Sequence, residues 1–470
     1  MNLKINTSSA NPEVEDDQPV SPQAQYLNSE VLCISILAVF ESEIPIDDSQ
    51  ATCTLENLFL PINPRFSSIM VKDEHGTSKW KKVQIKLGDH IKTPIFPPGL
   101  ELYDDYMQEY LAKIATDLLP EDKPLWNIHI IKYPTKQAAG SLVFKLHHSL
   151  GDGFSLMAAL FNCAQRADNP SLPLTFPSNE NPKPQKWGAY RFVSKVFSMC
   201  INTVKDFTWS LLMSSVMKDS ITPIRSGEVG IEDRPITLST VTFSLSEIKQ
   251  IKAKLQGTVN DAVTGIIFHG IQLYMQSAGQ KTKPAKVTAL VLLNTRAMRT
   301  YQPVEEMVRR DSQAPWGNHF AFLHVSVPAH KDAERADPLN SIRRAKKTIK
   351  AKRNSLGVHL TAGALDLMRK FKGPEVVSKQ VYKTLANTSM AISNMIGPIE
   401  KMQIANHPVK SFYFMMVRAP QSLTITVVSY MGMIKVAIGA ERDFINSELL
   451  VSCMEKSFQR IFEEAVGKRS

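Results

Sequence analysis

Apolar and polar positions along the first half of the chain predict a mixture of strands and helices. Residues 31–40 form an almost unbroken apolar run, which is typical of a strand buried on both faces. Residues 103–119 repeat apolar side chains at three- and four-residue spacing, which predicts an amphipathic helix that ends at Pro120. Further strands are expected at 127–132 and 141–146, so the first half is predicted to combine both kinds of element.

The second half shows the same mixture of patterns. Strands are expected at residues 236–244, 286–293, 318–327, 388–393, 412–417, 423–430 and 433–440. Asn260 and Asp261 stand where a side chain can cap the start of a helix, and a closing amphipathic helix is expected at 444–466. Each half is therefore predicted to be an α/β unit.

A proline-rich stretch separates the halves. Residues 169–185 contain five prolines, which no helix or central strand tolerates. Because 470 residues exceed what one hydrophobic core usually holds, we expect two domains of about 200 residues each. The predicted division is a subdomain at 22–168, a linker with a hydrophobic helix at 169–235, and a second subdomain at 236–470. Residues 1–21 are polar and acidic without the apolar segment of a signal peptide, and are expected to be a disordered tail.

Residues 192–217 form the most hydrophobic helical segment of the chain. A transmembrane span is one interpretation, but Lys205 and Asp206 fall near its centre, where each charge costs about 2.5–3.5 kcal/mol on insertion scales. A helix that lies on a membrane surface fits the pattern better, and burial against the protein fits it almost as well.

Composition and charge narrow the class of partner. A hydrophobic content of 43% fits a globular protein, and the net charge of +10 suits an anionic partner such as a phosphorylated cofactor, an acidic membrane surface or nucleic acid. The basic helix expected around residues 343–353 most simply presents a solvated face, with CoA phosphates or anionic lipid as the alternative ligands. Nucleic acid is not expected, because no interleaved aromatic residues or known binding motif accompany the charge. The five scattered cysteines lack a Cys-x-x-Cys pair and indicate neither a zinc site nor a disulfide framework.

Candidate chemistry is concentrated where the strand at 141–146 ends. His147 and His148 follow that strand directly, and Asp152 and Gly153 precede an apolar helical segment. Loops at strand ends often carry catalytic groups, and histidine is the natural base for removing a proton from a hydroxyl near neutral pH. A histidine pair that caps the strand, or half of a metal site, is the alternative. No metal is expected, because no third ligand follows at His-x-x-x-His spacing.

Four motifs resemble those of one enzyme family. Residues 147–153 resemble the HHxxxDG motif of CoA-dependent acyltransferases and peptide-synthetase condensation domains. Residues 124–126 resemble a PLW motif, residues 260–261 an ND motif, and residues 393–398 an SNVPGP motif in which Met-Ile replaces Val-Pro. In this order, the four are similar to the motifs of the wax ester synthase/diacylglycerol acyltransferase family, in its plant branch.

The resemblance implies an α/β fold of two chloramphenicol-acetyltransferase-like subdomains. These would form a pseudo-dimer, with the active site and a tunnel at their interface. The family assigns catalysis to the second histidine of the motif, so His148 is the expected general base, with His147 and Asp152 as the other members of the catalytic set. Asp152 is expected to pair with a buried arginine that holds the loop, and Arg296 is the candidate partner.

The expected substrate-binding residues are Gly153, Asn260, Asp261, Ser393 and Asn394. Side-chain amides and hydroxyls among them would steady the oxyanion or the acceptor. Helix capping is an equally good interpretation of Asn260 and Asp261.

The resemblance also implies the substrates and the location. Long-chain acyl-CoA is the expected donor, a fatty alcohol or diacylglycerol the expected acceptor, and no separate cofactor is expected. Water-insoluble acceptors imply a membrane surface as a partner, on the cytosolic face of the endoplasmic reticulum or at the plasma membrane. Two alternatives stay open. One is a soluble acyltransferase of the plant specialised-metabolite type, whose Asp-Phe-Gly-Trp-Gly motif is absent here. The other is a non-catalytic lipid-binding homologue that keeps the fold and the tunnel.

Overall fold

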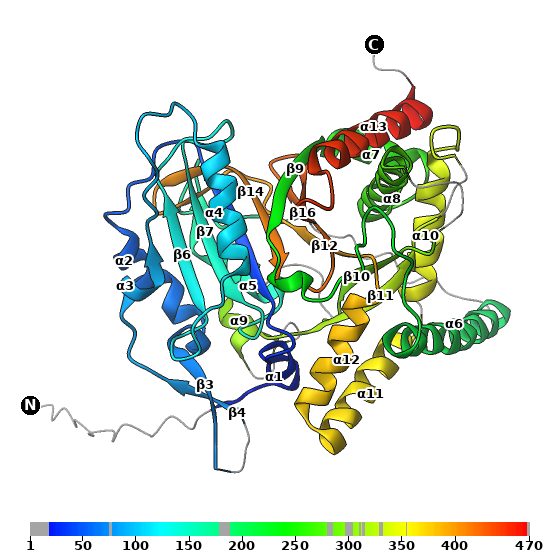
Figure 1. Ribbon diagram of the computed structural model, residues 1–470, viewed down its shortest axis with the longest axis horizontal. Coiled ribbons are helices and arrows are strands. Elements are labelled where there is room, and N and C mark those ends of the chain that lie inside the picture. Colours follow the sequence, from blue (N-terminus) through cyan, green and yellow to red (C-terminus); the bar gives the residue numbers. More distant parts are fainter. Residues whose placement is uncertain are drawn as a thin grey trace, which may run out of the picture.

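Two β-sheets lie side by side, and helices pack against both of them (Figure 1). The computed structural model describes residues 18–74, 78–177, 189–279, 285–296, 304–309, 312, 315–328, 332–353 and 355–467. The predicted α/β class and the presence of two α/β units are confirmed.

Among the described residues, the first sheet has seven strands around β2, which is buried along its whole length. Across the sheet the strands are β5 (Ile91–Lys92), β6 (Trp126–Ile131), β7 (Gly140–His147), β2 (Ser35–Ser42), β14 (His407–Val417), β13 (Met402–Ile404) and β8 (Ala164–Arg166). Alternate residues of β2 enter two separate cores. Helix α4 (Asp104–Thr116) contributes to one core and α5 (Gly153–Asn162) to the other. Antiparallel pairing of Ser35 with His147 fixes the end of β7, and therefore the start of the histidine loop.

The second sheet has six strands within the same described part of the chain. In order they are β11 (Phe320–Ser326), β10 (Thr288–Asn294), β12 (Met390–Ile396), β15 (Leu423–Tyr430), β16 (Met433–Glu441) and β9 (Ile236–Ser244). Strand β12 is parallel to both of its neighbours, and the other pairs are antiparallel. A single core joins this sheet to α7 (Leu245–Lys254), α8 (Val259–Ser277), α10 (Leu339–Arg353) and α13 (Ser447–Val466). The strand predicted at 236–244 and the hairpin predicted at 423–440 are confirmed.

The two units are interlocked because a late segment of the chain returns to the first sheet. After β12 in the second sheet, the chain adds β13 and β14 to the first sheet before it comes back as β15. Strand β14 pairs with β2 in antiparallel register, with Phe412 opposite Phe40. Residues 402–417 therefore depart from the predicted second subdomain at 236–470, because a local strand pattern does not say which sheet the strand joins. The rest of that division stays a prediction.

A further group of helices packs beside β11. It comprises α1 (Pro22–Leu27), α6 (Ala189–Ser215), α11 (Gly357–Lys372) and α12 (Pro374–Ala386). Helix α6 agrees with the hydrophobic helix predicted at 192–217, and Figure 1 shows it at the edge of the molecule. Several of its apolar side chains are exposed, including Ile201, Val204 and Leu211. None of the helices in the described residues combines the length and the apolar character that crossing a bilayer requires.

Short elements make up the rest of the secondary structure. They are β1 (Gln18–Pro19), α2 (Ala51–Thr54), β3 (Ser68–Lys72), β4 (Ser78–Lys82), α3 (Leu87–His90), α9 (Val304–Val308) and helical turns at Leu55–Phe59, Leu60–Ile62, Pro64–Ser67 and Ile231–Asp233. Residues 1–17 of the predicted tail and 178–188 of the predicted linker lie outside the described residues. Residues 18–21 differ from the predicted disorder: β1 pairs with β4, and Ser21 caps α1.

Candidate active site

The loop between β7 and α5 carries the histidine motif and lies where the two units meet. Asp152 ends the loop and caps α5, because its Oδ1 accepts a hydrogen bond of 3.0 Å from the Ser155 amide. Residues 315–319 of the second unit lie along the loop, and the Trp316 indole donates to the Leu150 carbonyl over 2.8 Å. Both halves of the chain therefore hold the loop that the sequence predicted to be catalytic.

An ion pair with Arg296 fixes Asp152. Arg296 Nη1 donates to Oδ2 over 2.7 Å and Nη2 donates to Oδ1 over 3.1 Å, and both side chains are buried. The His319 amide adds a bond of 2.8 Å to Oδ2. Burial alone raises the pKa of Asp152, but the Arg296 charge and these hydrogen bonds outweigh it, so the pKa lies below its usual value. The predicted pairing with Arg296 is confirmed. Both carboxylate oxygens of Asp152 are used in contacts that fix the loop.

Asn318 sets the tautomer of His148. The Asn318 Nδ2 donates to the His148 carbonyl over 2.9 Å, which turns the amide oxygen toward the imidazole. His148 Nδ1 lies 2.9 Å from that oxygen, so Nδ1 carries the hydrogen and donates it. Nε2 is left as an acceptor that has no hydrogen-bond partner among the described residues. A neutral imidazole with a free, unprotonated nitrogen is what a general base requires.

The surroundings of His148 keep it neutral. Its side chain is buried, and its ring centroid lies 5.3 Å from that of Phe320, with the two planes tilted by 60°. Burial lowers the pKa of His148 below its usual value, although the Asp152 charge and the Asn318 hydrogen bond oppose this shift. The imidazole is therefore unprotonated at neutral pH.

His147 has a supporting position. Its Nδ1 lies 2.7 Å from Ser149 Oγ and its Nε2 lies 3.3 Å from Cys33 Sγ, so both ring nitrogens already have partners. Burial, followed by the neighbouring His148, lowers the pKa of His147 to about 3. The neutral His147 ring therefore stabilises the loop through both of its nitrogens, whereas His148 has one nitrogen without a partner among the described residues.

A cavity of about 480 Å³ opens beside the loop and is lined by both units. We call it the active-site cavity. Asp152 and Gly153 reach it from the first unit, and Asn260, Ser393 and Asn394 from the second. The Asn394 side-chain amide donates to Asn260 Oδ1 over 2.8 Å, so two of the predicted binding residues contact each other on its wall. The structure thus gathers residues that are far apart in the sequence.

Two of the predicted binding residues have local structural roles. A Cβ at Gly153 would come within 3.1 Å of Met395 Sδ, so glycine lets the loop lie close to β12. Asp261 is not among the residues that line the cavity, and it forms a capping box with Thr258. The helix cap is therefore Thr258, which corrects the predicted cap at Asn260, while Asn260 faces the cavity.

Positive charge gathers on the same cavity. Lys352 and Arg353, at the end of the predicted basic helix, line it together with His359. Lys352 Nζ also pairs with Asp206 on α6 over 2.7 Å. Most other basic side chains of this helix are exposed, as the sequence predicted, whereas Lys346 is half-buried and donates to the Leu255 and Gln256 carbonyls. No cluster of side chains in the described part of the chain is arranged to hold a metal ion.

The sequence did not single out Asn318, Trp316 or Phe320. The available signal was positional: Asn318 opens the strand predicted at 318–327, just as the histidines follow the strand at 141–146. Polar residues at strand ends are where a fixed scaffold presents functional groups. Nothing in the local pattern, however, shows that these two strand ends meet.

Interlocked α/β units with a histidine loop and a cavity at their junction form a chloramphenicol-acetyltransferase-like fold. The solved wax ester synthase/diacylglycerol acyltransferase from Marinobacter aquaeolei VT8 has this fold, with a TM-score of 0.60, 14% identity, and coverage of 95% of this chain and 100% of that one. The starter condensation domain of rhizomide synthetase, solved with C8-CoA, aligns at a TM-score of 0.52 with 10% identity, over 96% of this chain and 94% of that one. These structural likenesses show the fold.

Sequence comparison identifies the family. Residues 37–263 match the wax ester synthase/diacylglycerol acyltransferase catalytic domain, and residues 316–462 match the WS/DGAT C-terminal domain. Wax ester synthase/diacylglycerol acyltransferase 4 of Arabidopsis thaliana is 28% identical over 484 residues, which cover 97% of this chain and 92% of the relative. The chain belongs to the wax ester synthase/diacylglycerol acyltransferase family and is an acyl-CoA-dependent O-acyltransferase.

Proposed function

We propose that the enzyme transfers a long-chain acyl group from acyl-CoA to the hydroxyl of a fatty alcohol or a diacylglycerol, with His148 as the general base. His148 Nε2 takes the hydroxyl proton while the oxygen attacks the thioester carbonyl and the new C–O bond forms. The tetrahedral intermediate then collapses, the C–S bond breaks, and the proton on His148 passes to the departing thiolate. The products are the ester and free CoA.

The contact between Asn318 and His148 carries this proposal. Because Asn318 Oδ1 can only accept a hydrogen bond, the hydrogen of the neutral His148 ring lies on Nδ1, and Nε2 is the basic nitrogen. The same contact fixes the orientation of the ring. Asp152 acts through the loop rather than on the substrate, since Arg296 and two backbone amides use its carboxylate. His147 has the same kind of supporting role.

The active-site cavity offers groups that suit the thioester substrate. Arg353 would bind a phosphate of CoA, because its guanidinium carries a permanent positive charge beside the cavity, whereas the Lys352 charge is already paired with Asp206. The Ser393 hydroxyl and the Asn394 amide would steady the oxyanion. A condensation domain of the same fold was solved with C8-CoA, which supports an acyl-CoA as the donor.

Product analysis tests the activity directly. We expect purified enzyme with labelled palmitoyl-CoA to form labelled wax ester from hexadecanol, or labelled triacylglycerol from diacylglycerol. Release of free CoA should match ester formation, because no acyl-enzyme accumulates. Binding of palmitoyl-CoA without either ester would support the non-catalytic lipid-binding alternative.

The pH dependence of kcat/KM tests the role of His148. Because burial lowers the pKa of His148, the base loses activity only as the pH falls below 6.5, the ordinary value for histidine. Asn318→Asp places a carboxylate against Nδ1, which favours the imidazolium and raises the pKa of His148. We expect the acid limb to move up by about one unit or more, with activity retained at higher pH.

The matched control is Asn318→Ala. It removes the oxygen that fixes the tautomer but adds no charge, so activity should fall at every pH without an upward shift of the acid limb. An acid limb at the same pH in the wild type and in Asn318→Asp would mean that the titrating base is not His148.

We also propose that the enzyme attaches to the cytosolic face of the endoplasmic reticulum membrane, or to the plasma membrane, through α6 and α11. Val204 and Leu211 on α6 are 66% and 54% exposed, and Leu367 and Phe371 on α11 are 57% and 80% exposed. Exposed lysines stand beside these apolar side chains on both helices. Apolar side chains flanked by positive charge suit the surface of an acidic bilayer.

Extraction from membranes tests this attachment. High salt or alkaline carbonate should release much of the protein, because a surface helix is held by a shallow apolar face and by screened charge. Phe371→Asp should increase the soluble fraction without salt, whereas the same change at a buried position would unfold the protein. Release by detergent alone would contradict surface attachment.

A further inference from the structure

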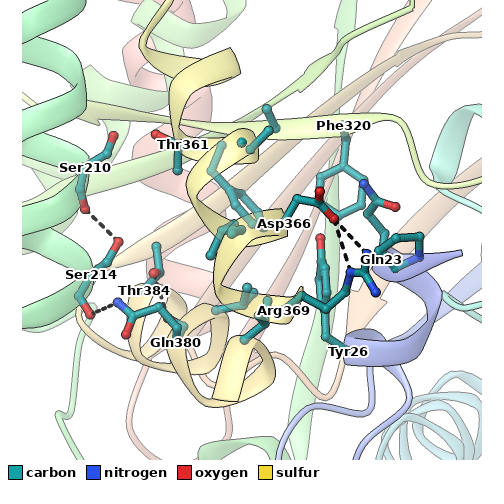
Figure 2. A pocket seen from close by; sticks show the side chains of 18 of the residues that line it. Gln23, Tyr26, Ser210, Ser214, Phe320, Thr361, Asp366, Arg369, Gln380 and Thr384 are labelled. Atoms are coloured by element: carbon teal, nitrogen blue, oxygen red, sulfur yellow. Dashed lines mark hydrogen bonds and ion pairs between the residues drawn. The ribbon is translucent and has the colours of Figure 1, made fainter. Parts of the chain in front are cut away.

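One side of α11 is apolar and exposed to solvent. The side chains on this side, from the N-cap onward, recur at spacings of four and seven residues, which places them on one narrow face of an α-helix. We call them the α11 stripe, and they are Leu356, Leu360, Leu367 and Phe371. Another side of the helix packs inward, where Thr361 and Asp366 line a cavity between α11, α12 and α1 (Figure 2). The α11 stripe is therefore an apolar surface that faces away from the protein core.

The start of the α11 stripe borders the active-site cavity. Ser355 and His359 line the cavity, and each is followed directly by an exposed leucine, Leu356 or Leu360. Arg353, at the end of α10, also lines the cavity and is exposed. Positive charge and exposed apolar side chains thus meet at one edge of the cavity. We call these five residues the cavity rim.

Helix α6 holds the cavity rim in place. The Leu356 amide donates to Thr203 Oγ1 over 2.9 Å, and Lys352, next to Arg353, pairs with Asp206 over 2.7 Å. Another side of α6 exposes apolar side chains such as Val204. Helices α6 and α11 contact each other along the edge of the molecule (Figure 1). The cavity rim is therefore fixed against the same two helices that present the exposed apolar surface.

Long-chain acyl-CoA has the same two-part character as the cavity rim. Its acyl chain dissolves in a bilayer, whereas its phosphates stay among the headgroups at the surface. Leu356 and Leu360 suit the hydrocarbon boundary, and the Arg353 guanidinium suits a phosphate. A donor that passes over this rim moves from the bilayer to the cavity without exposing its acyl chain to water, which avoids a large hydrophobic cost.

We propose that the cavity rim takes long-chain acyl-CoA directly from the membrane surface, with the α11 stripe at the hydrocarbon boundary and Arg353 on a phosphate. This route rests on the proposed donor site and on the proposed attachment through α6 and α11, and it adds the way in which the donor arrives. Capture of acyl-CoA that first dissolves in water is the alternative route.

Transfer of a fluorescent long-chain acyl-CoA from vesicles to the full-length enzyme distinguishes the two routes. The vesicles contain phosphatidylcholine, phosphatidylserine and a quencher, so the fluorescence rises as the acyl-CoA leaves them. With the enzyme in excess, we expect the transfer rate to rise in proportion to the enzyme concentration, because collision with the vesicle limits direct transfer. Capture from water would give a constant rate, because departure from the bilayer would then limit the transfer.

Three variants locate the point of entry. Leu360→Asp places a charge in the α11 stripe at the cavity rim and should lower the rate of transfer about tenfold. Phe371→Asp changes the same stripe about three turns away and should cause a smaller loss. Leu172→Asp is the matched control, because Leu172 is 47% exposed, against 48% for Leu360, and lies on neither α6 nor α11. Its transfer rate should equal that of the wild type.

Binding without a membrane is measured by equilibrium dialysis with hexanoyl-CoA, whose short chain stays in water. Leu360→Asp should leave the Kd for hexanoyl-CoA unchanged, because Leu360 is not among the residues that line the active-site cavity. Arg353→Met should instead raise this Kd about fivefold, since it removes the charge proposed to bind a phosphate.

A transfer rate that does not depend on the enzyme concentration would overturn the inference, even if the enzyme sediments with the vesicles. Equal losses in Leu360→Asp and in either Phe371→Asp or Leu172→Asp would also overturn it. An enzyme that does not sediment with the vesicles would contradict the proposed attachment and the inference together. Direct transfer in the expected pattern, without ester formation when hexadecanol or diacylglycerol is added, would contradict only the proposed acyl transfer.

Discussion

Replacing His148 by alanine should lower the rate of ester formation by about a hundredfold or more, the usual range for the loss of a general base. The change removes the only ring whose free nitrogen is proposed to take the acceptor proton. Some stability should also be lost, because Asn318 Oδ1 is buried and loses its partner, which costs about 1–3 kcal/mol. Product formation and the melting temperature are therefore measured together.

His147→Ala is the matched control for that experiment. The two histidines are adjacent and both buried, but the ring nitrogens of His147 are engaged by Ser149 and Cys33. We expect His147→Ala to lose stability to a similar or greater extent, with a smaller loss of activity in the fraction that remains folded. A His148→Ala enzyme that forms ester at the wild-type rate would end the general-base mechanism.

Asp152→Ala should destabilise the protein by about 3–5 kcal/mol, since it leaves the buried Arg296 charge without its partner. The same change removes the cap of α5 and the acceptor for the His319 amide. Loss of activity should accompany a large drop in melting temperature or poor expression. Thermal unfolding, followed alongside product formation, separates this result from that of His148→Ala.

Two further variants show which contact of Asp152 accounts for the loss of stability in Asp152→Ala. Asp152→Asn keeps an oxygen that can cap α5 but lacks the charge, so it isolates the ion pair. Asp152→Ala combined with Arg296→Met removes both charges and should recover part of the stability, because an unpaired buried charge costs more than an apolar pair. A stable Asp152→Ala enzyme with a specific catalytic defect would place Asp152 in the chemistry instead.

The sequence predicted several local elements and one ion pair of the candidate site correctly. Strand 236–244 and the hairpin at 423–440 follow from alternation, which depends only on neighbouring residues. Arg296, at the end of the strand expected at 286–293, was the candidate partner for Asp152, and the structure pairs the two side chains. Local patterns were sufficient for the strand and the hairpin, and the ion pair was identified as a candidate.

Relations between distant segments were not predictable in the same way. Asn318 lies 170 residues from His148 in the sequence, and only the packing of the two units shows that their side chains are in contact. A cavity of about 360 Å³ between α1, α6, α11, α12 and the start of β11 is lined by residues from Pro22 to Thr384, so no single stretch of the sequence signals it (Figure 2). Thr258, rather than Asn260, caps α8, because the backbone geometry at the helix start, and not residue type alone, decides the cap.

The pairing of β2 with the late strand β14 has a consequence for folding during translation. Strand β2 is complete at Ser42, but its neighbour β14 begins only at His407, 365 residues later. At about 5–20 residues per second, a ribosome needs roughly 20–70 s to cover that distance. During this interval an apolar central strand has one bare edge, which favours association with other chains unless a chaperone shields it. The amino-terminal unit therefore cannot complete its fold ahead of the carboxy-terminal one, and the two mature as one folding unit.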